Sequence, residues 1–190
     1  MAVFTKLSDQ DFQNILGNYN IGEFVSAKGI AEGIENTNYL LNTSQNKFIL
    51  TIYEARINED DLPFFINLQK ELNSFGFFCP KPVMANNELL INEFAGKKYT
   101  IVSFIDGSWP REITNNEVVK SAEALAKFHN LSGKLSEGLS RKNNMDREFW
   151  YGMYQKVSEH TKEHFKTDYN LIEEAFSLTE DWKNKLPSNL

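Results

Sequence analysis

The chain has little that would mark a secreted or membrane protein. Cys79 is its one cysteine in 190 residues, so no internal disulfide can form and a reducing compartment, the cytoplasm, is expected. No run approaches the roughly 20 apolar residues of a membrane span. The first residues also lack an apolar segment followed by a cleavage site. Neither a membrane nor a secretory signal is therefore predicted.

Excess positive charge is also absent. The formal net charge is −6 and the pI is about 5.2. A protein that binds nucleic acid without regard to sequence needs a basic surface, so that class is not expected. Hydrophobic residues make up 41% and aromatic residues 13%, which indicates a globular chain of one large domain or two small ones.

A glycine-rich turn within residues 29–38 is the most informative segment. It lies between runs that read as strands, and Thr37–Thr43 and Phe48–Tyr53 have the aliphatic and aromatic content of strands. Glycine lets backbone N–H groups approach an anion because it has no Cβ. Kinase-like folds cover the phosphates of ATP with such a turn. An ordinary three-stranded meander with polar turns would give the same local pattern.

The remaining patterns predict an α+β fold with two parts. A five-stranded antiparallel sheet with helices is expected in residues 1–107, and a helical part in residues 108–190. The predicted elements are a helix from Ser8 to Gly17, strands at about 23–30, 37–43 and 47–53, a helix from Leu62 to Gly76, strands at about 88–94 and 99–105, and helices at Thr114–His129, Arg147–Phe165 and Asn170–Leu186.

Several phrases resemble the bacterial type II homoserine kinases, in the choline-kinase and aminoglycoside-phosphotransferase branch of the protein-kinase-like fold. The phrase at residues 28–39 looks like the nucleotide-loop signature of that family. The other similar segments, at matching intervals, are Ile49–Glu54, Asp61–Phe65, Cys79-Pro80, Ser103–Gly107 and Ala124–His129. The resemblance is dense to about residue 130 and thin afterwards.

The resemblance implies ATP:L-homoserine O-phosphotransfer, a step of threonine synthesis, with ATP and Mg²⁺ as cofactors. The glycine-rich turn would cover the phosphates, and a hinge would hold adenine. The nucleotide-binding residues implied are Gly29, Gly33, Asn36, Thr51, Ser103, Phe104 and Ile105.

Two departures from the family pattern matter. Phosphoryl transfer in this fold needs an Asp in a His-x-Asp-x-x-x-x-Asn loop and a second, metal-binding Asp. No such loop follows His129, His160 or His164. We therefore expect an incomplete helical lobe that ends before the catalytic loop, in an inactive fragment of a longer kinase; a natural homologue without catalysis is the alternative. No catalytic or metal residue is assigned.

The second departure is at Thr51, which matches the strand position where protein kinases carry a lysine. Lys28 or Arg56 are the nearest cations by sequence, and Glu71 would have been the natural partner of a strand lysine. Other acceptors such as choline or an aminoglycoside, a non-catalytic nucleotide-binding or interaction module, and a purely structural domain remain open.

Overall fold

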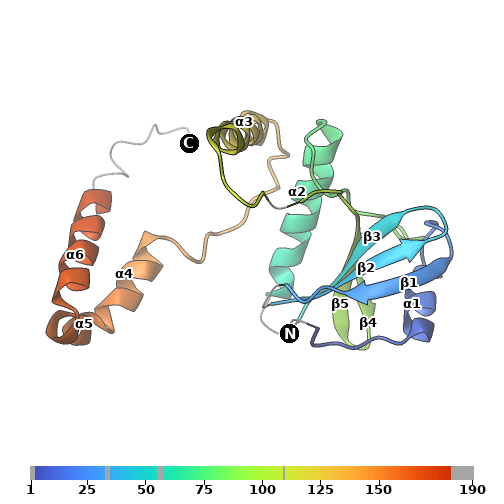
Figure 1. Ribbon diagram of the computed structural model, residues 1–190, viewed down its shortest axis with the longest axis horizontal. Helices are drawn as coiled ribbons and strands as arrows, with labels where there is room; N and C mark the ends of the chain where they lie inside the picture. Colours follow the sequence, from blue (N-terminus) through green and yellow to red (C-terminus); the bar gives the residue numbers. More distant parts are fainter. Residues whose placement is uncertain (1–2, 33–34, 55–57, 109, 181–190) are drawn as a thin grey trace. The chain divides into compact units, whose positions relative to one another are not determined.

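The computed structural model describes residues 3–32, 35–54, 58–108 and 110–180. The described chain is α+β, as predicted (Figure 1). Its elements are α1 (Asp9–Leu16), β1 (Phe24–Gly29), β2 (Thr37–Thr43), β3 (Lys47–Ile52), η1 (Glu59–Asp61), α2 (Leu62–Ser74), β4 (Asn92–Phe94), β5 (Lys97–Ser103), α3 (Asn115–Ser132), α4 (Arg147–Gln155), α5 (Ser158–His164) and α6 (Lys166–Glu180).

The strands form one five-stranded sheet in the order β1-β2-β3-β5-β4, with every neighbouring pair antiparallel. Figure 1 shows the strands side by side with α1 against them. Short hairpins connect β1 to β2, β2 to β3 and β4 to β5, and such connections produce antiparallel pairs. The predicted five-stranded antiparallel sheet is confirmed.

Both predicted capping boxes open helices. The Ser8 hydroxyl accepts from the Asp11 backbone N–H at 3.3 Å, and the Asp11 carboxylate accepts from the Ser8 N–H at 2.8 Å. Thr114 and Glu117 make the same reciprocal pair before α3. Each box satisfies backbone donors that a helix start leaves free, which fixes where the helix begins.

The hydrophobic core lies between α1 and one face of the sheet. Phe12, Ile15 and Leu16 of α1 are almost fully buried. They join a cluster whose sheet residues include Tyr39, Leu41, Phe48, Leu50, Ile52, Tyr99 and Ile101. Because side chains alternate along a strand, the residues between these point to the other face. That face is covered in part, because Thr100 on it is 1% exposed, whereas Leu40, Ile49 and Val102 are half-buried.

The three largest differences from the predicted element boundaries concern a strand and two helices. The strand expected from residue 88 begins at Asn92, because Glu88 adopts a positive φ of 63° in a turn closed by its N–H to the Ala85 carbonyl. The helix expected over residues 147–165 divides into α4 and α5 at Val157, whose φ of −121° and ψ of −1° are not helical. The last helix starts at Lys166 rather than Asn170, and its predicted end lies outside the described residues.

By its internal contacts the chain divides into two units, residues 1–141 and 142–190. In the second unit, α4 packs on α6 through ring contacts of Phe176 with Tyr151 at 5.2 Å and Tyr154 at 5.5 Å. Among the described helices, none combines the length and apolar character that a membrane crossing needs.

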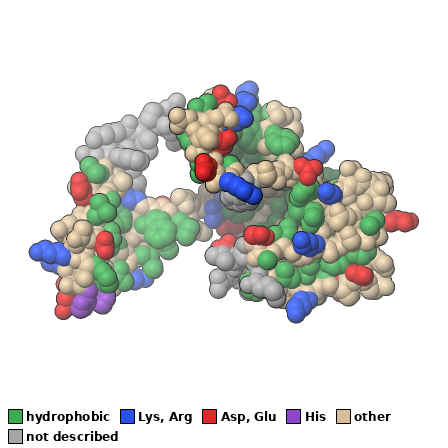
Figure 2. Space-filling model, viewed as in Figure 1, with side chains coloured by type: hydrophobic (Ala, Val, Ile, Leu, Met, Phe, Trp, Pro, Cys, Tyr) green, Lys and Arg blue, Asp and Glu red, His purple; other side chains and the backbone are tan. Residues whose placement is uncertain are grey.

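Apolar side chains are widely exposed on the helices after residue 110. No residue of α3 is buried, and Tyr154 is the one buried residue of α4. The exposed large apolar residues of these helices include Val118, Val119, Leu125, Phe149, Trp150, Met153, Leu171 and Leu178. Figure 2 shows such green patches over the unit that carries the two purple histidines.

Candidate functional site

The glycine-rich turn connects the end of β1 to the start of β2. Gly29 ends β1 and Thr37 begins β2, so these two residues are the feet of the turn. A Cβ on Gly29 would lie 2.8 Å from a methyl carbon of Val3, which is closer than real Cβ contacts allow. A side chain at this position would therefore require Val3 to move. Gly33 lies outside the described residues.

The turn is held at its feet more than along its length. In its described parts, residues 30–32 and 35–36, the single hydrogen bond joins the Ile30 N–H to the Asn38 carbonyl at 2.9 Å. The side-chain oxygen of Asn36 is buried and has no hydrogen-bond partner there. A buried polar atom without a partner is costly unless a ligand or water satisfies it.

The sheet face opposite the core carries two rows of side chains across the strands. Lys28, Leu40, Ile49 and Val102 are register partners over β1, β2, β3 and β5. The last three are half-buried aliphatic residues. They form an apolar row across β2, β3 and β5. Such a surface suits one face of a planar ring.

The neighbouring row is polar and lies nearer the glycine-rich turn. Asn38, Thr51 and Thr100 are register partners, and the Thr51 hydroxyl donates to the Asn38 side-chain oxygen at 2.8 Å. Thr100 is buried, with its hydroxyl 3.1 Å from that of Tyr53, so Asn38 and Thr51 are the partly exposed members of this row. The exposed part of the sheet face therefore changes from apolar to polar toward the turn. A nucleotide has the same gradient from base to phosphates.

Of the cations considered for the missing strand lysine, Lys28 lies on the apolar row and is exposed. Arg56 lies outside the described residues. Glu71 does not reach toward Thr51; its carboxylate accepts the Ser136 backbone N–H at 2.9 Å. That hydrogen bond lowers the pKa of Glu71. Glu71 thus joins α2 to the segment after α3.

The predicted hinge begins at the end of β5. The Ser103 N–H donates to the Lys81 carbonyl at 2.9 Å, and the Phe104 N–H donates to the Lys47 carbonyl at 3.2 Å. Within the described parts of the chain, no hydrogen bond is made by the Phe104 carbonyl or by the backbone groups of Ile105. An acceptor and a donor are thus available one and two residues beyond the strand, at Phe104 and Ile105.

A cavity of about 490 Å³ adjoins this segment. Its lining includes all three predicted hinge residues, Ser103, Phe104 and Ile105, together with Cys79 and Asp106. Burial raises the pKa of the Cys79 thiol, so this cysteine stays protonated and unreactive at neutral pH. The structure therefore places the hinge residues beside a cavity, but Leu40, Ile49 and Val102 do not line it.

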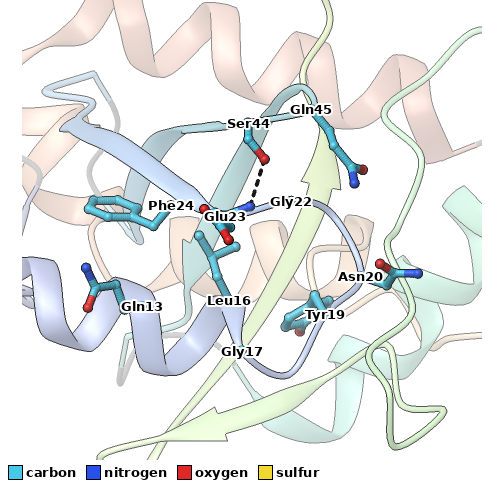
Figure 3. Close-up of a pocket in the computed structure, with 10 residues that line it drawn as sticks. All are labelled: Gln13, Leu16, Gly17, Tyr19, Asn20, Gly22, Glu23, Phe24, Ser44 and Gln45. Atoms are coloured by element: carbon cyan, nitrogen blue, oxygen red, sulfur yellow. Dashed lines mark hydrogen bonds between the residues drawn. The ribbon is translucent and has the colours of Figure 1, made fainter.

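A larger cavity, of about 650 Å³, lies on the α1 side of the sheet (Figure 3). Its wall includes Gln13, Tyr19, Glu23 and Ser44, and the Ser44 hydroxyl accepts the Glu23 N–H at 3.0 Å. None of the predicted site residues lines it. Size alone does not make it the better candidate, because its polar groups do not converge on one point in the way a specific ligand requires.

The histidines do not form a site. His160 and His164 lie on one turn of α5 with ring centroids 4.5 Å apart, and both are exposed. Among the described residues, no three His, Cys, Asp or Glu side chains are grouped so that they could hold a metal ion. The structure thus gives no ligand set for Mg²⁺ in the part that it describes.

Sequence reasoning selected Thr51 but missed the aliphatic row beside it. Leu40, Ile49 and Val102 are ordinary strand residues, and nothing in their type marks a site. The sequence signal that could have found this row is the alternation of side chains between the two faces of β3. It places Ile49 on the same face as Thr51, and Leu50 in the core.

Curated relatives match the whole chain. A homoserine kinase of Paramagnetospirillum magneticum is 38% identical over 192 residues, and one of Bartonella henselae is 37% identical over 191. Each alignment covers 100% of this chain, but only 58% and 59% of the relative. The chain thus spans less than two thirds of the length of these relatives.

Solved structures of low sequence identity share the fold. A spectinomycin phosphotransferase, solved in complex with ADP and spectinomycin, matches with a TM-score of 0.66 at 13% identity over 96% of this chain and 60% of its own. A microcompartment-associated aminopropanol kinase matches with a TM-score of 0.57 at 17% identity, over 74% of this chain and 46% of its own. The kinase-like fold is confirmed.

A family model described as the phosphotransferase enzyme family matches residues 26–189. This range begins in β1 and includes the glycine-rich turn, the two-row sheet face and the hinge. This match, together with relatives that align with the whole of this chain at 37–38% identity, establishes the family. The chain belongs to the phosphotransferase enzyme family.

Proposed function

We propose that this chain is the nucleotide-binding part of an ATP-dependent kinase that phosphorylates the hydroxyl of L-homoserine. The observation that carries the proposal is the match of the whole chain to about three fifths of relatives named homoserine kinase. The sheet face and the hinge support the nucleotide half of it. The acceptor half rests on the names of the relatives alone.

In this proposal, adenine lies against Leu40, Ile49 and Val102, with its edge toward Ser103, Phe104 and Ile105. The edge of adenine offers both a hydrogen-bond donor and acceptors. The free carbonyl of Phe104 and the free backbone groups of Ile105 suit such an edge.

The phosphates then lie toward the polar row and the glycine-rich turn. Gly29, Gly33, Asn36 and Thr51 keep their predicted nucleotide-binding roles. The Thr51 hydroxyl already donates a hydrogen bond to Asn38, so Thr51 would offer the phosphates a neutral polar surface and no charge. ATP supplies the transferred phosphoryl group when bound, and these residues bind and orient it.

Mg²⁺ is expected for this chemistry, but the described residues do not offer a set of ligands for it. We assign it no residue here. The predicted division into a nucleotide-covering lobe, residues 1–107, and a partial helical lobe, residues 108–190, belongs to the same proposal. The two units defined by internal contacts divide the sequence at a different place, after residue 141, because α3 belongs to the same unit as the sheet.

Catalytic groups would come from the portion of the relatives that this chain does not match, about two fifths of their length. The 190-residue chain by itself is then an inactive fragment of a cytoplasmic enzyme of threonine synthesis. A positioned catalytic group contributes roughly 10²–10⁴-fold to a rate. The fragment should therefore fall below about a thousandth of the rate of the longer protein.

A coupled assay of the complete gene product with ATP and three acceptors tests the proposal. Homoserine should be turned over, whereas choline and kanamycin should give no more than background. The 190-residue chain, with its mass confirmed, is the matched control and should be inactive. Turnover of choline or kanamycin in place of homoserine would reject the acceptor, and no turnover of any acceptor would favour a non-catalytic nucleotide-binding or interaction module.

A further inference from the structure

The N-terminal strap, residues 3–7, contacts both feet of the glycine-rich turn. Val3 fills the space beside Gly29 where a side chain would otherwise stand. The N–H groups of Phe4 and Thr5 donate to the Thr37 hydroxyl at 2.9 and 3.1 Å. This segment lies more than thirty positions away from Thr37 in the sequence, so the contacts are tertiary rather than local.

Glu54 joins the strap to the sheet at the same place. One of its carboxylate oxygens accepts from the hydroxyls of Thr5 and Thr37, each at 2.7 Å. The other oxygen accepts from the Lys97 ammonium, which also donates to the Thr5 hydroxyl at 2.7 Å. One carboxylate thus connects the strap, the start of β2, the end of β3 and the start of β5.

The burial of this network distinguishes it from a surface ion pair. The Glu54 side chain is 12% exposed, and Thr37 is fully buried. The next residue of β5, Lys98, pairs with Glu93 at 2.7 Å with side chains 36% and 56% exposed. Lys97 itself is 40% exposed, so the difference lies in the carboxylate: Glu54 is shielded and accepts from three donors, whereas Glu93 is exposed.

Burial by itself would raise the pKa of Glu54. The hydrogen bonds from Lys97, Thr37 and Thr5 outweigh that effect and lower it. Glu54 is therefore ionised at neutral pH. Its charge is directed to these three groups, and no nucleotide is needed to explain it.

We propose that Glu54 is a positioning residue for the glycine-rich turn and acts through Thr37 and the N-terminal strap. The network and the strap contact both ends of the turn, at Gly29 and Thr37, and so hold it at its feet. Loss of the network would leave the turn free to open locally while the core remained folded. The proposal rests on the proposed function, because the turn then meets the nucleotide phosphates.

Two variants and two controls separate this role from general stability. Glu54→Gln removes the negative charge of the carboxylate. Thr5→Val removes the side-chain hydroxyl of the strap and changes no strand residue. Thr5→Ser keeps that hydroxyl and should restore wild-type behaviour. Glu93→Gln is the matched control, since it removes the exposed ion pair between Glu93 and Lys98, the residue that follows Lys97 in β5.

The first readout is hydrogen exchange of residues 30–36 in the 190-residue chain without nucleotide. We expect exchange about tenfold faster or more in Glu54→Gln and Thr5→Val, because a hydrogen bond to a charged group is lost. The β2 and β3 core amides should not change, nor should the turn in Thr5→Ser or Glu93→Gln. Unchanged turn exchange in Thr5→Val, or equal acceleration throughout the sheet, would overturn the proposal.

The second readout is kinetics of the complete gene product. The KM for ATP should rise about tenfold in Glu54→Gln and Thr5→Val, while the KM for homoserine stays the same. An equal change in both KM values would overturn the positioning role. If the wild-type protein does not use ATP at all, the proposed function fails, and the exchange experiment still decides whether the network holds the turn.

Discussion

Glu54 carries a negative charge that hydrogen bonds from Lys97, Thr37 and Thr5 stabilise. Its folded-state pKa is lower than the ordinary value of 4.5. A carboxyl of this kind contributes stability that is fully present above its unfolded pKa. That contribution is lost as the pH falls through the folded-state pKa.

Glu54→Gln should therefore lower the free energy of unfolding at neutral pH by about 1–3 kcal/mol. The difference from wild type should shrink as the pH is lowered below 4.5, because the wild-type carboxylate is then protonated. Urea unfolding of both proteins from pH 7 to pH 3 measures it. A difference that stays constant over this range would show that ionisation of Glu54 does not matter.

Ile49 and Leu50 are adjacent residues of β3 on opposite faces. Leu50 is fully buried in the core, and Ile49 is half-buried on the candidate adenine surface. Leu50→Ala should cost about 2–5 kcal/mol of stability through the cavity it leaves. Ile49→Ala should cost less but raise the KM for ATP. Thermal unfolding and ATP kinetics of the two variants would contradict the assignment of faces if these effects were exchanged.

At the scale of residues, the sequence singled out polar and glycine positions for the candidate site and passed over apolar ones. Gly29, Thr51 and the hinge have residue types or flanking motifs that attract attention. Leu40 and Val102 become part of a candidate site only through register, which joins residues from strands distant in the sequence. No local pattern contains that information.

In the proposed site, the hinge is the element that recognises adenine. Ile105 lies beyond β5 and makes no backbone hydrogen bond in the described chain, so its N–H can be removed without loss of a sheet bond. Ile105→Pro should raise the KM for ATP by about tenfold with a small change in melting temperature. Ile105→Ala, which keeps the N–H, is the control. An unchanged KM for ATP in the proline variant would contradict adenine binding at the hinge.

Element prediction succeeded where capping and turn residues decide the boundary. The capping boxes at Ser8 and Thr114 start their helices as expected. It was wrong at Glu88 and Val157, where no glycine or proline marks the turn and the break. At such positions tertiary contacts select the backbone conformation, and propensity is too weak to show it.

At the scale of the whole molecule, the sheet part and the later helices differ in how well they are buried. The sheet has a continuous core with α1, whereas α3 buries no residue and α4 buries Tyr154 alone. Exposed apolar patches favour association, and weakly packed helices open locally at little cost.

Hydrogen exchange of the 190-residue chain should therefore show weaker protection in α3 and α4–α6 than in β2 and β3. The difference should be much smaller in the complete gene product, whose additional residues would cover these helices. Equal, strong protection of residues 147–180 and of the β2–β3 strands in a monomer would show that the chain is a complete folded unit. The fragment proposal would then be rejected.

The location of the nucleotide can be measured directly. We would titrate the isotopically labelled chain with millimolar ATP and follow backbone and methyl NMR signals. The largest changes are expected at Ile49, Val102 and Ile105, on the sheet face opposite the core and the hinge, with little change at Tyr19 and Ser44 in the cavity of Figure 3. Changes concentrated in that cavity, or no change anywhere, would contradict a nucleotide site on this face of the sheet.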